Sequence, residues 1–314
     1  MSLTTIIAFK GDFGTEFREI LEPIRPRAKD FRTQGNLPAF NSSGYPMLAP
    51  YRIQAHEAAT VGVAFDYLAR FIIAKYTKIP MDLSAFFFYQ AFHYIEDQHR
   101  KPVTDRIKNH YVLIDKFFQE TEISDEFIGH LCSIAKLEQI ARQGVFDPDT
   151  DLPFILEKNP MSMVADIRKQ GVVFKRVFID SNLINPNSFI IYNPEYSTQV
   201  TNALRGIDAD IYFDGVLLDF KSTKNFLYDK NHAYQLLGYY LFQLIDKALK
   251  KKTELSLENI EKLAFYKSRA GQIEYYPVKN FDKKAVFEAL VKITELFKIK
   301  VKQDDLISVV SDMY

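Results

Sequence analysis

The feature that most constrains the fold is a two-residue turn signal, Asp214-Gly215, between two runs that alternate with period two. The runs ADIYF and VLLDF are rich in residues that favour β-strands, and Asp-Gly is typical of a type I′ hairpin turn. Such a turn fixes the register, so residue 213 faces 216, residue 211 faces 218 and residue 210 faces 219. Asp210 is therefore expected directly opposite Asp219.

The same alternation sorts the hairpin side chains onto two faces, because successive residues of a strand point in opposite directions. One face is predicted to face the core, with Ala209, Ile211, Phe213, Val216, Leu218 and Phe220. The other is predicted to be reactive, with Asp208, Asp210, Tyr212, Leu217, Asp219 and Lys221.

Like charges directly opposite each other on an antiparallel pair are destabilising, so something must compensate Asp210 and Asp219. A hard divalent cation would do so, since Mg²⁺ is held by one or two carboxylates together with water and substrate phosphates. Lys221 would then lie beside the metal. A scaffold in which the opposed acids bind a purely structural cation is an alternative interpretation.

A further motif follows the hairpin. Gln235 and Tyr239 are spaced i and i+4, which places them on one face of a helix. Asp210, then the triplet Asp219-Phe220-Lys221, then Gln-x-x-x-Tyr, resembles the active site of the PD-(D/E)XK nuclease superfamily, which has the restriction-endonuclease-like fold. The Gln235 motif resembles that of its RecB-type branch, including bacterial members of unknown role.

The resemblance implies a Mg²⁺- or Mn²⁺-dependent nuclease that hydrolyses phosphodiester bonds of nucleic acid, with DNA favoured over RNA. It implies that Asp210, Asp219 and the backbone carbonyl of Phe220 bind the metal. Lys221 would orient the attacking water and stabilise the developing negative charge.

Gln235 and Tyr239 would position the water, the lysine or the phosphate. Asp208, opposite Lys221, is expected to hold that lysine through a salt bridge. The main alternative is a catalytically silent nuclease fold that binds nucleic acid or protein.

Residues 53–76 show the apolar spacing of a long amphipathic helix, which would be the first helix of the nuclease core. Glu57 lies one turn before Val61 on the same side, where this fold often supplies another acid to the metal. An exposed first-turn acid stabilised by the helix dipole is the alternative for Glu57. Asp66 and Arg70 are expected to form an i,i+4 ion pair.

The order of signals predicts an α/β (mixed α+β) fold, with a mixed sheet flanked by helices. The chain divides into an irregular N-terminal arm with one short helix near residues 15–21 (1–50), the first core helix (51–80), a helical insertion (81–185) and the nuclease core (186–314). The core is expected to contain a strand at 188–192, a polar loop at 195–206, a second hairpin around Ala270-Gly271 and a closing helix at 282–300. A second D-x-K triplet at Asp282 is interpreted as a helix cap.

Composition excludes several classes of protein. Lys plus Arg and Asp plus Glu both number 40, so the protein has no net charge to attract nucleic acid. This balance counts against a protein that coats DNA independently of sequence. The single Cys132 excludes an intramolecular disulfide and a Cys-rich metal site. No apolar run is long enough for a membrane helix and no signal-peptide pattern is present, which predicts a cytoplasmic protein without a membrane partner. Histidines without metal-motif spacing are expected in the core or on the surface: His93, His99, His110 and His130.

Overall fold

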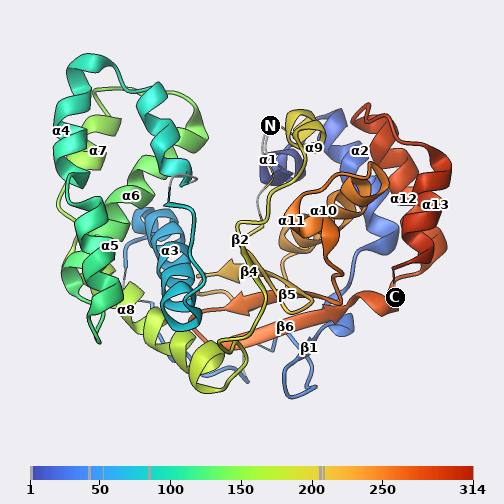
Figure 1. The fold of residues 1–314 in the computed structure, drawn as a ribbon, viewed down its shortest axis with the longest axis horizontal. Coiled ribbons are helices and arrows are strands. Elements are labelled where there is room, and N and C mark those ends of the chain that lie inside the picture. Colours follow the sequence, from blue (N-terminus) through green and yellow to red (C-terminus); the bar gives the residue numbers. More distant parts are fainter. Residues whose placement is uncertain are drawn as a thin grey trace.

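A computed structural model describes residues 3–41, 44–51, 53–83, 86–204, 207 and 209–313. The fold is mixed α+β, with a six-stranded sheet between two layers of helices (Figure 1). The fold class expected from the sequence is therefore confirmed. In the part of the chain described, no helix combines the length and the apolar character needed to cross a membrane.

The sheet has the strand order β1-β6-β5-β4-β3-β2. Neighbouring strands are antiparallel except for β4 and β5, which are parallel. The strands are β1 (Arg32–Thr33), β2 (Ile190–Tyr192), β3 (Ile211–Phe213), β4 (Val216–Lys221), β5 (Lys262–Lys267) and β6 (Gln272–Pro277).

Two layers of helices cover the sheet, one on each face (Figure 1). The first, called the α3 layer, comprises η3 (Ala55–Glu57), α3 (Ala58–Thr77), η5 (Phe87–His93), α4 (Asp97–Ile107), α5 (His110–Gln119), α6 (Asp125–Gln143), α7 (Asp151–Leu156), α8 (Met161–Lys175) and the π-helix η6 (Arg176–Asp180). The second, called the α10 layer, comprises α1 (Leu3–Ala8), α2 (Asp12–Leu21), η1 (Glu22–Ile24), η2 (Ala28–Asp30), α9 (Thr198–Leu204), α10 (Lys230–Ala248), α11 (Glu254–Leu257), η7 (Val278–Asn280), α12 (Lys283–Leu296) and α13 (Gln303–Ser311).

The Asp214 hairpin has the register that the turn signal predicts. Ile211 pairs with Leu218, Tyr212 with Leu217 and Phe213 with Val216. Both turn residues have positive φ, 42° at Asp214 and 83° at Gly215, as a type I′ turn requires. The second hairpin, around Gly271, is also present as β5 and β6.

Both faces of the hairpin are buried, although only one was expected to face the core. Ile211, Phe213, Leu218 and Phe220 pack into the hydrophobic core of the α3 layer. Tyr212 and Leu217 pack into the core of the α10 layer. Ala209 also belongs to the α10 side, because strict alternation stops where β3 begins, at Ile211.

Two segments are more regular than expected. The first fifty residues contain α1, α2 and the edge strand β1, so they are part of the α10 layer and the sheet, and the short helix expected near 15–21 is the second half of α2. The segment 195–206, expected as a polar loop, contains α9. Its buried residues Val200 and Leu204 explain this difference, since tertiary packing stabilises a helix that is short and polar in sequence.

Other local expectations are confirmed. Asp282 caps α12, where its carboxylate accepts a hydrogen bond from the backbone N–H of Ala285 at 2.7 Å. Cys132 is buried on α6. Residues 82–181 are almost entirely helical where the structure describes them, and this insertion packs against α3 and the sheet.

A buried ion pair connects the α3 layer to the β5–β6 turn. Arg269 and Asp166 are both fully buried, and the guanidinium makes two hydrogen bonds of 2.9 Å to the carboxylate. Arg269 Nε also donates to the carbonyl of Ser222, just beyond β4. Gln170 donates to the same carboxylate and accepts from Ser222 Oγ. The end of β4 is thus fixed against α8.

We expect Arg269→Met to destabilise the protein by about 3–5 kcal/mol, because it leaves the Asp166 carboxylate buried without its counter-ion. Lys175→Met, which removes an exposed cation paired with Asp180 on the same side of the molecule, should cost at most about 1 kcal/mol. Urea unfolding of both variants measures the difference. Equal midpoints for the two variants would show that the buried pair does not hold the layers together.

A pair of buried histidines lies between α5 and α6. Nδ1 of His110 and Nε2 of His130 are 2.8 Å apart. Burial lowers the pKa of His110 to about 4, and burial together with the neighbouring His110 lowers the pKa of His130 to about 3. Both histidines are buried, so they lie in the core, one of the two locations expected for them.

This pair predicts acid sensitivity. Below about pH 6.5 these histidines are protonated in the unfolded chain but remain neutral in the folded protein. The free energy of unfolding therefore falls as the pH falls from about 6.5 towards about 4, by up to about 1.4 kcal/mol per pH unit for each histidine. His130→Gln should flatten the dependence of unfolding free energy on pH in this window, whereas replacement of the exposed His93 by Asn should not. An unchanged slope in His130→Gln, measured by urea unfolding at several pH values, would contradict the assignment.

Candidate active site

The C-terminal end of β4 carries the two central site residues, Asp219 and Lys221, which the strand's alternation puts on one face. Asp219 is buried, with 3% exposure. The Lys221 ammonium lies 2.5 Å from Asp219 Oδ2. No donor in the described structure approaches that oxygen with hydrogen-bond geometry, so the attraction between the two groups is electrostatic.

Helix α10 brings the Gln-x-x-x-Tyr motif to the same place. Lys221 Nζ donates to Gln235 Oε1 at 3.2 Å, and Gln235 Nε2 donates to the Tyr239 hydroxyl at 2.7 Å. Asp229 caps the start of this helix through the backbone N–H groups of residues 231 and 232. A continuous chain of polar contacts therefore runs from Asp219 to Tyr239.

Asp210 lies just before β3, so it is not a ladder partner of Asp219 as the extended register predicted. Its Oδ2 accepts a hydrogen bond of 2.5 Å from the backbone N–H of Phe220, and its carbonyl accepts one of 3.2 Å from Asn193. The carboxylate is thus fixed at the residue between Asp219 and Lys221. Asp208, expected to pair with Lys221, lies outside the described residues, as does Arg205 of the segment expected as a polar loop.

These side chains line a pocket of about 240 Å³ between the two helical layers. Its walls come from α1, α3, α6, β4, α10 and the residues before β3. They are formed by Leu3, Thr4, Gly62, Val63, Asp66, Glu138, Arg142, Ile207, Asp210, Asp219, Phe220, Lys221, Gln235 and Tyr239. Of the residues predicted for the site, those that the structure describes therefore all line one pocket, apart from Glu57.

Glu57 lies elsewhere. It ends η3, its carboxylate accepts a hydrogen bond of 2.6 Å from the backbone N–H of Gln54, and it does not line the pocket. The alternative interpretation, an exposed acid at the start of the helix, gives its position correctly but not its exposure, because the side chain is buried. The acid that the first core helix contributes to the pocket is Asp66.

Asp66 forms the expected ion pair with Arg70, at 2.5 Å through Oδ2. Its other oxygen, Oδ1, is buried and has no hydrogen-bond partner in the described structure. Burial, reinforced by the charge of Glu138, raises the pKa of Asp66 to about 6. In the sequence, the i,i+4 ion pair with Arg70 is a sufficient explanation for Asp66, so nothing there marks it as a residue of the pocket.

The carboxylates of the pocket repel one another. Burial first, and then the charges of Asp219 and Asp66, raise the pKa of Asp210 well above its ordinary value. Lys221 and the hydrogen bond from Phe220 act in the opposite direction. Asp210 and Asp219 therefore repel each other, as the sequence predicted, although they are not paired in the strand ladder.

The pocket also includes residues that no sequence pattern singles out. Glu138 and Arg142 of α6 line the wall formed by the helical insertion. Leu3 and Thr4 of α1 cover the start of α10, where Thr4 Oγ1 accepts a hydrogen bond from Gln235 at 2.9 Å. Gly238 allows this approach, because a Cβ there would lie 2.9 Å from Leu3 Cδ2.

Among the described residues, no group of three or more His, Cys, Asp or Glu side chains is arranged to hold a metal ion. The metal site expected from the sequence uses two carboxylates together with a backbone carbonyl. The candidate pair is Asp219, which precedes Phe220 in the chain, and Asp210, whose carboxylate accepts a hydrogen bond from the backbone N–H of Phe220.

Comparison of the chain with protein-family models, with curated proteins and with solved structures gave no match. The functional assignment therefore rests on the residues of this pocket and on their geometry.

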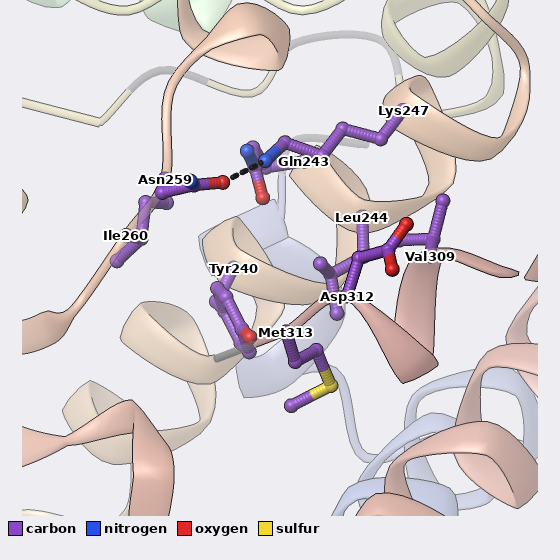
Figure 2. Close-up of a pocket in the computed structure, with 9 residues that line it drawn as sticks. All are labelled: Tyr240, Gln243, Leu244, Lys247, Asn259, Ile260, Val309, Asp312 and Met313. Carbon is purple, nitrogen blue, oxygen red and sulfur yellow. Dashed lines mark hydrogen bonds between the residues drawn. The ribbon is translucent and has the colours of Figure 1, made fainter.

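A second cavity, of about 300 Å³, lies along the later half of α10 (Figure 2). Gln243 is almost fully buried there, and its Nε2 donates to the carbonyls of Leu255 and Glu258. Lys247 donates to Asn259 at 2.9 Å across one edge of the cavity. These contacts join α10 to the segment that leads into β5, so they support the placement of the helix that carries Gln235.

We expect Asp210→Asn to melt, in EDTA, at the same temperature as the parent or higher. The amide can still accept the hydrogen bond from Phe220, while the repulsion from Asp219 and Asp66 is removed, a gain on the order of 0.2–1 kcal/mol. Added Mg²⁺ should then stabilise the parent more than the variant, since a ligand that binds only the folded state stabilises it by mass action.

Thermal scans with EDTA and with Mg²⁺ test this expectation. Asp105→Asn, at an exposed ion pair remote from the pocket, is the control and should respond to Mg²⁺ as the parent does. A clear fall in the melting temperature of Asp210→Asn under EDTA would identify Asp210 as a structural hydrogen-bond acceptor.

Proposed function

We propose that this protein is a metal-dependent nuclease of the PD-(D/E)XK type, in its RecB-type branch, which hydrolyses phosphodiester bonds of nucleic acid in the cytoplasm. DNA is the favoured substrate and RNA the alternative. The observation that supports the proposal most directly is the chain of contacts from Asp219 through Lys221 and Gln235 to Tyr239, next to Asp210 in one pocket.

The charge of the pocket supports a divalent cation. Among the residues that the structure describes, four carboxylates line it, those of Asp66, Glu138, Asp210 and Asp219, against two cationic side chains, Arg142 and Lys221. Such a pocket repels a phosphate group unless a cation is added. Asp66 Oδ1 has no hydrogen-bond partner in the described structure, and Asp219 Oδ2 contacts the Lys221 ammonium without an aligned hydrogen bond. Buried carboxylate oxygens of this kind are the hard ligands that Mg²⁺ and Mn²⁺ prefer.

Asp210, Asp219 and the carbonyl of Phe220 would hold the metal, with Asp66 adding negative charge nearby. When bound, a metal of this kind polarises the phosphate and lowers the pKa of a bound water. Lys221 donates hydrogen bonds and carries a positive charge, so it is suited to stabilise charge that develops on the phosphate.

Gln235 accepts from Lys221 and donates to Tyr239, which fixes the direction of the lysine side chain. Its role in this proposal is to position Lys221, and Tyr239 in turn fixes Gln235. Such support matters because a catalytic group displaced by a fraction of an ångström loses much of its effect.

Incubation with labelled single- and double-stranded DNA and RNA, in Mg²⁺, in Mn²⁺ and in EDTA, tests the proposal. Cleavage is expected with either metal and not in excess EDTA. Persistent cleavage in EDTA would refute the metal requirement. Binding without cleavage under every condition would favour the catalytically silent nuclease fold.

Lys221→Met should reduce cleavage by at least about a hundredfold, because it removes the donor that stabilises charge in the transition state. Metal affinity should remain close to that of the parent, since lysine is a donor and not a ligand. The measurements are initial cleavage rates and Mn²⁺ binding by calorimetry. Lys262→Met, at an exposed lysine of the neighbouring strand, is the matched control.

Complete loss of Mn²⁺ binding in Lys221→Met, with Lys262→Met unaffected, would show that Lys221 maintains the metal site itself. Full cleavage by Lys221→Met would remove the lysine from the mechanism.

A further inference from the structure

Helix α6 of the insertion brings two charged side chains, Glu138 and Arg142, to the pocket wall that lies across from β4 and α10. Figure 1 shows α6 in the α3 layer, on the opposite side of the molecule from α10. Gln139, between the two charged residues, donates to Thr60 at 2.9 Å and so fixes α6 against α3. The wall is therefore rigidly placed.

Arg142 is held by its neighbours in a defined direction. Its Nε and one terminal nitrogen lie 2.8 Å and 2.7 Å from Glu138 Oε1, and Glu138 Oε2 accepts a hydrogen bond from Tyr67. The guanidinium carbon lies 5.0 Å from the centre of the Phe87 ring. These contacts reduce the conformational entropy that the side chain would lose on binding a ligand.

The exposure of Arg142 separates it from a purely structural counter-ion. Arg70, which pairs with Asp66 on the same helix, α3, is 4% exposed and does not line the pocket. Arg142 is 47% exposed while its partner Glu138 is 5% exposed. A guanidinium that remains in contact with solvent at the rim of an anionic pocket can bind an anion that enters it.

We infer that Arg142 binds a phosphate of the nucleic-acid strand next to the phosphate that is cleaved, and that the strand enters the pocket unpaired. This inference rests on the proposed nuclease function. The helical insertion then supplies one side of a channel whose other side is β4 and α10. Arg142 is a substrate-binding residue in this arrangement, whereas Glu138 and Tyr67 position it.

The size of the pocket supports an unpaired strand. Its volume, about 240 Å³, lies below the roughly 300–1,000 Å³ typical of sites for small ligands. Helices on both sides, α3 and α6 against α1 and α10, line it. A pocket of this volume, with Lys221 and Arg142 both in its lining, has room for the backbone of one strand but not for the two paired strands of a duplex.

Arg142→Gln tests the inference, because glutamine can still donate to Glu138 but carries no charge. Arg142→Lys restores the charge, and Lys101→Gln removes an exposed, ion-paired cation of the same layer that does not line the pocket. Melting temperatures verify that each variant is folded. Binding of labelled single-stranded DNA is measured by fluorescence anisotropy at several salt concentrations, with Ca²⁺ supplying the metal charge, and cleavage kinetics are measured in Mg²⁺.

We expect Arg142→Gln to raise Kd and KM about tenfold, with kcat within about a factor of two of the parent. The slope of log affinity against log salt should fall by about 0.7, the loss of one phosphate contact on a single strand. Arg142→Lys should recover most of the affinity, Lys101→Gln should match the parent, and duplex DNA should compete poorly.

If Arg142→Gln is folded and has the same Kd, KM and salt slope as Lys101→Gln, the inference is overturned. A loss confined to kcat would also overturn it, because it would assign Arg142 to the arrangement of the reacting groups. Equal competition by duplex DNA would overturn the unpaired-strand assignment.

The proposed function fails separately from this inference. If the parent protein cleaves duplex DNA but does not bind single strands, the proposed nuclease function stands and the inference is overturned. If the parent binds single strands more tightly than Arg142→Gln does but does not cleave them, the result supports phosphate binding by Arg142 and refutes the nuclease function.

Discussion

Burial of both faces of the central sheet is the constraint on which the rest of the structure depends. A strand such as β4 contributes Leu218 to one hydrophobic core and Leu217 to the other, so helices must cover each side. With both faces covered, polar chemistry is confined to the ends of strands. Asp219 and Lys221 lie at such an end, where the α3 and α10 layers approach each other without filling the space between them.

The concentration of carboxylates at that strand end is costly for the folded protein, since buried like charges repel. The raised pKa of Asp210 expresses this cost. Lys221, fixed by Gln235, compensates part of it through its contact with Asp219. A cluster that is electrostatically unfavourable yet tightly positioned is a usual mark of a functional site, where local stability is reduced for the sake of binding or reaction.

The helical insertion takes part in both the stability and the chemistry of the core. Arg269 and Asp166 join α8 to the turn between β5 and β6, and through the Ser222 carbonyl they fix the segment that follows Lys221. On the adjacent helix, Arg142 reaches the pocket itself. The same packing that covers one face of the sheet therefore also supplies one wall of the candidate active site.

The sequence by itself determined what depends on neighbours along the chain. The Asp214-Gly215 turn specified the hairpin register, the i,i+4 spacing specified the shared face of Gln235 and Tyr239, and helical periodicity predicted α3, because backbone conformation and side-chain direction follow local patterns. Only the tertiary structure decided which distant charges meet. Glu57 became a helix cap and Asp66 a pocket acid, and Arg142 reached the same space across many intervening residues. No periodicity encodes such encounters, since they arise from the packing of whole helices against the sheet.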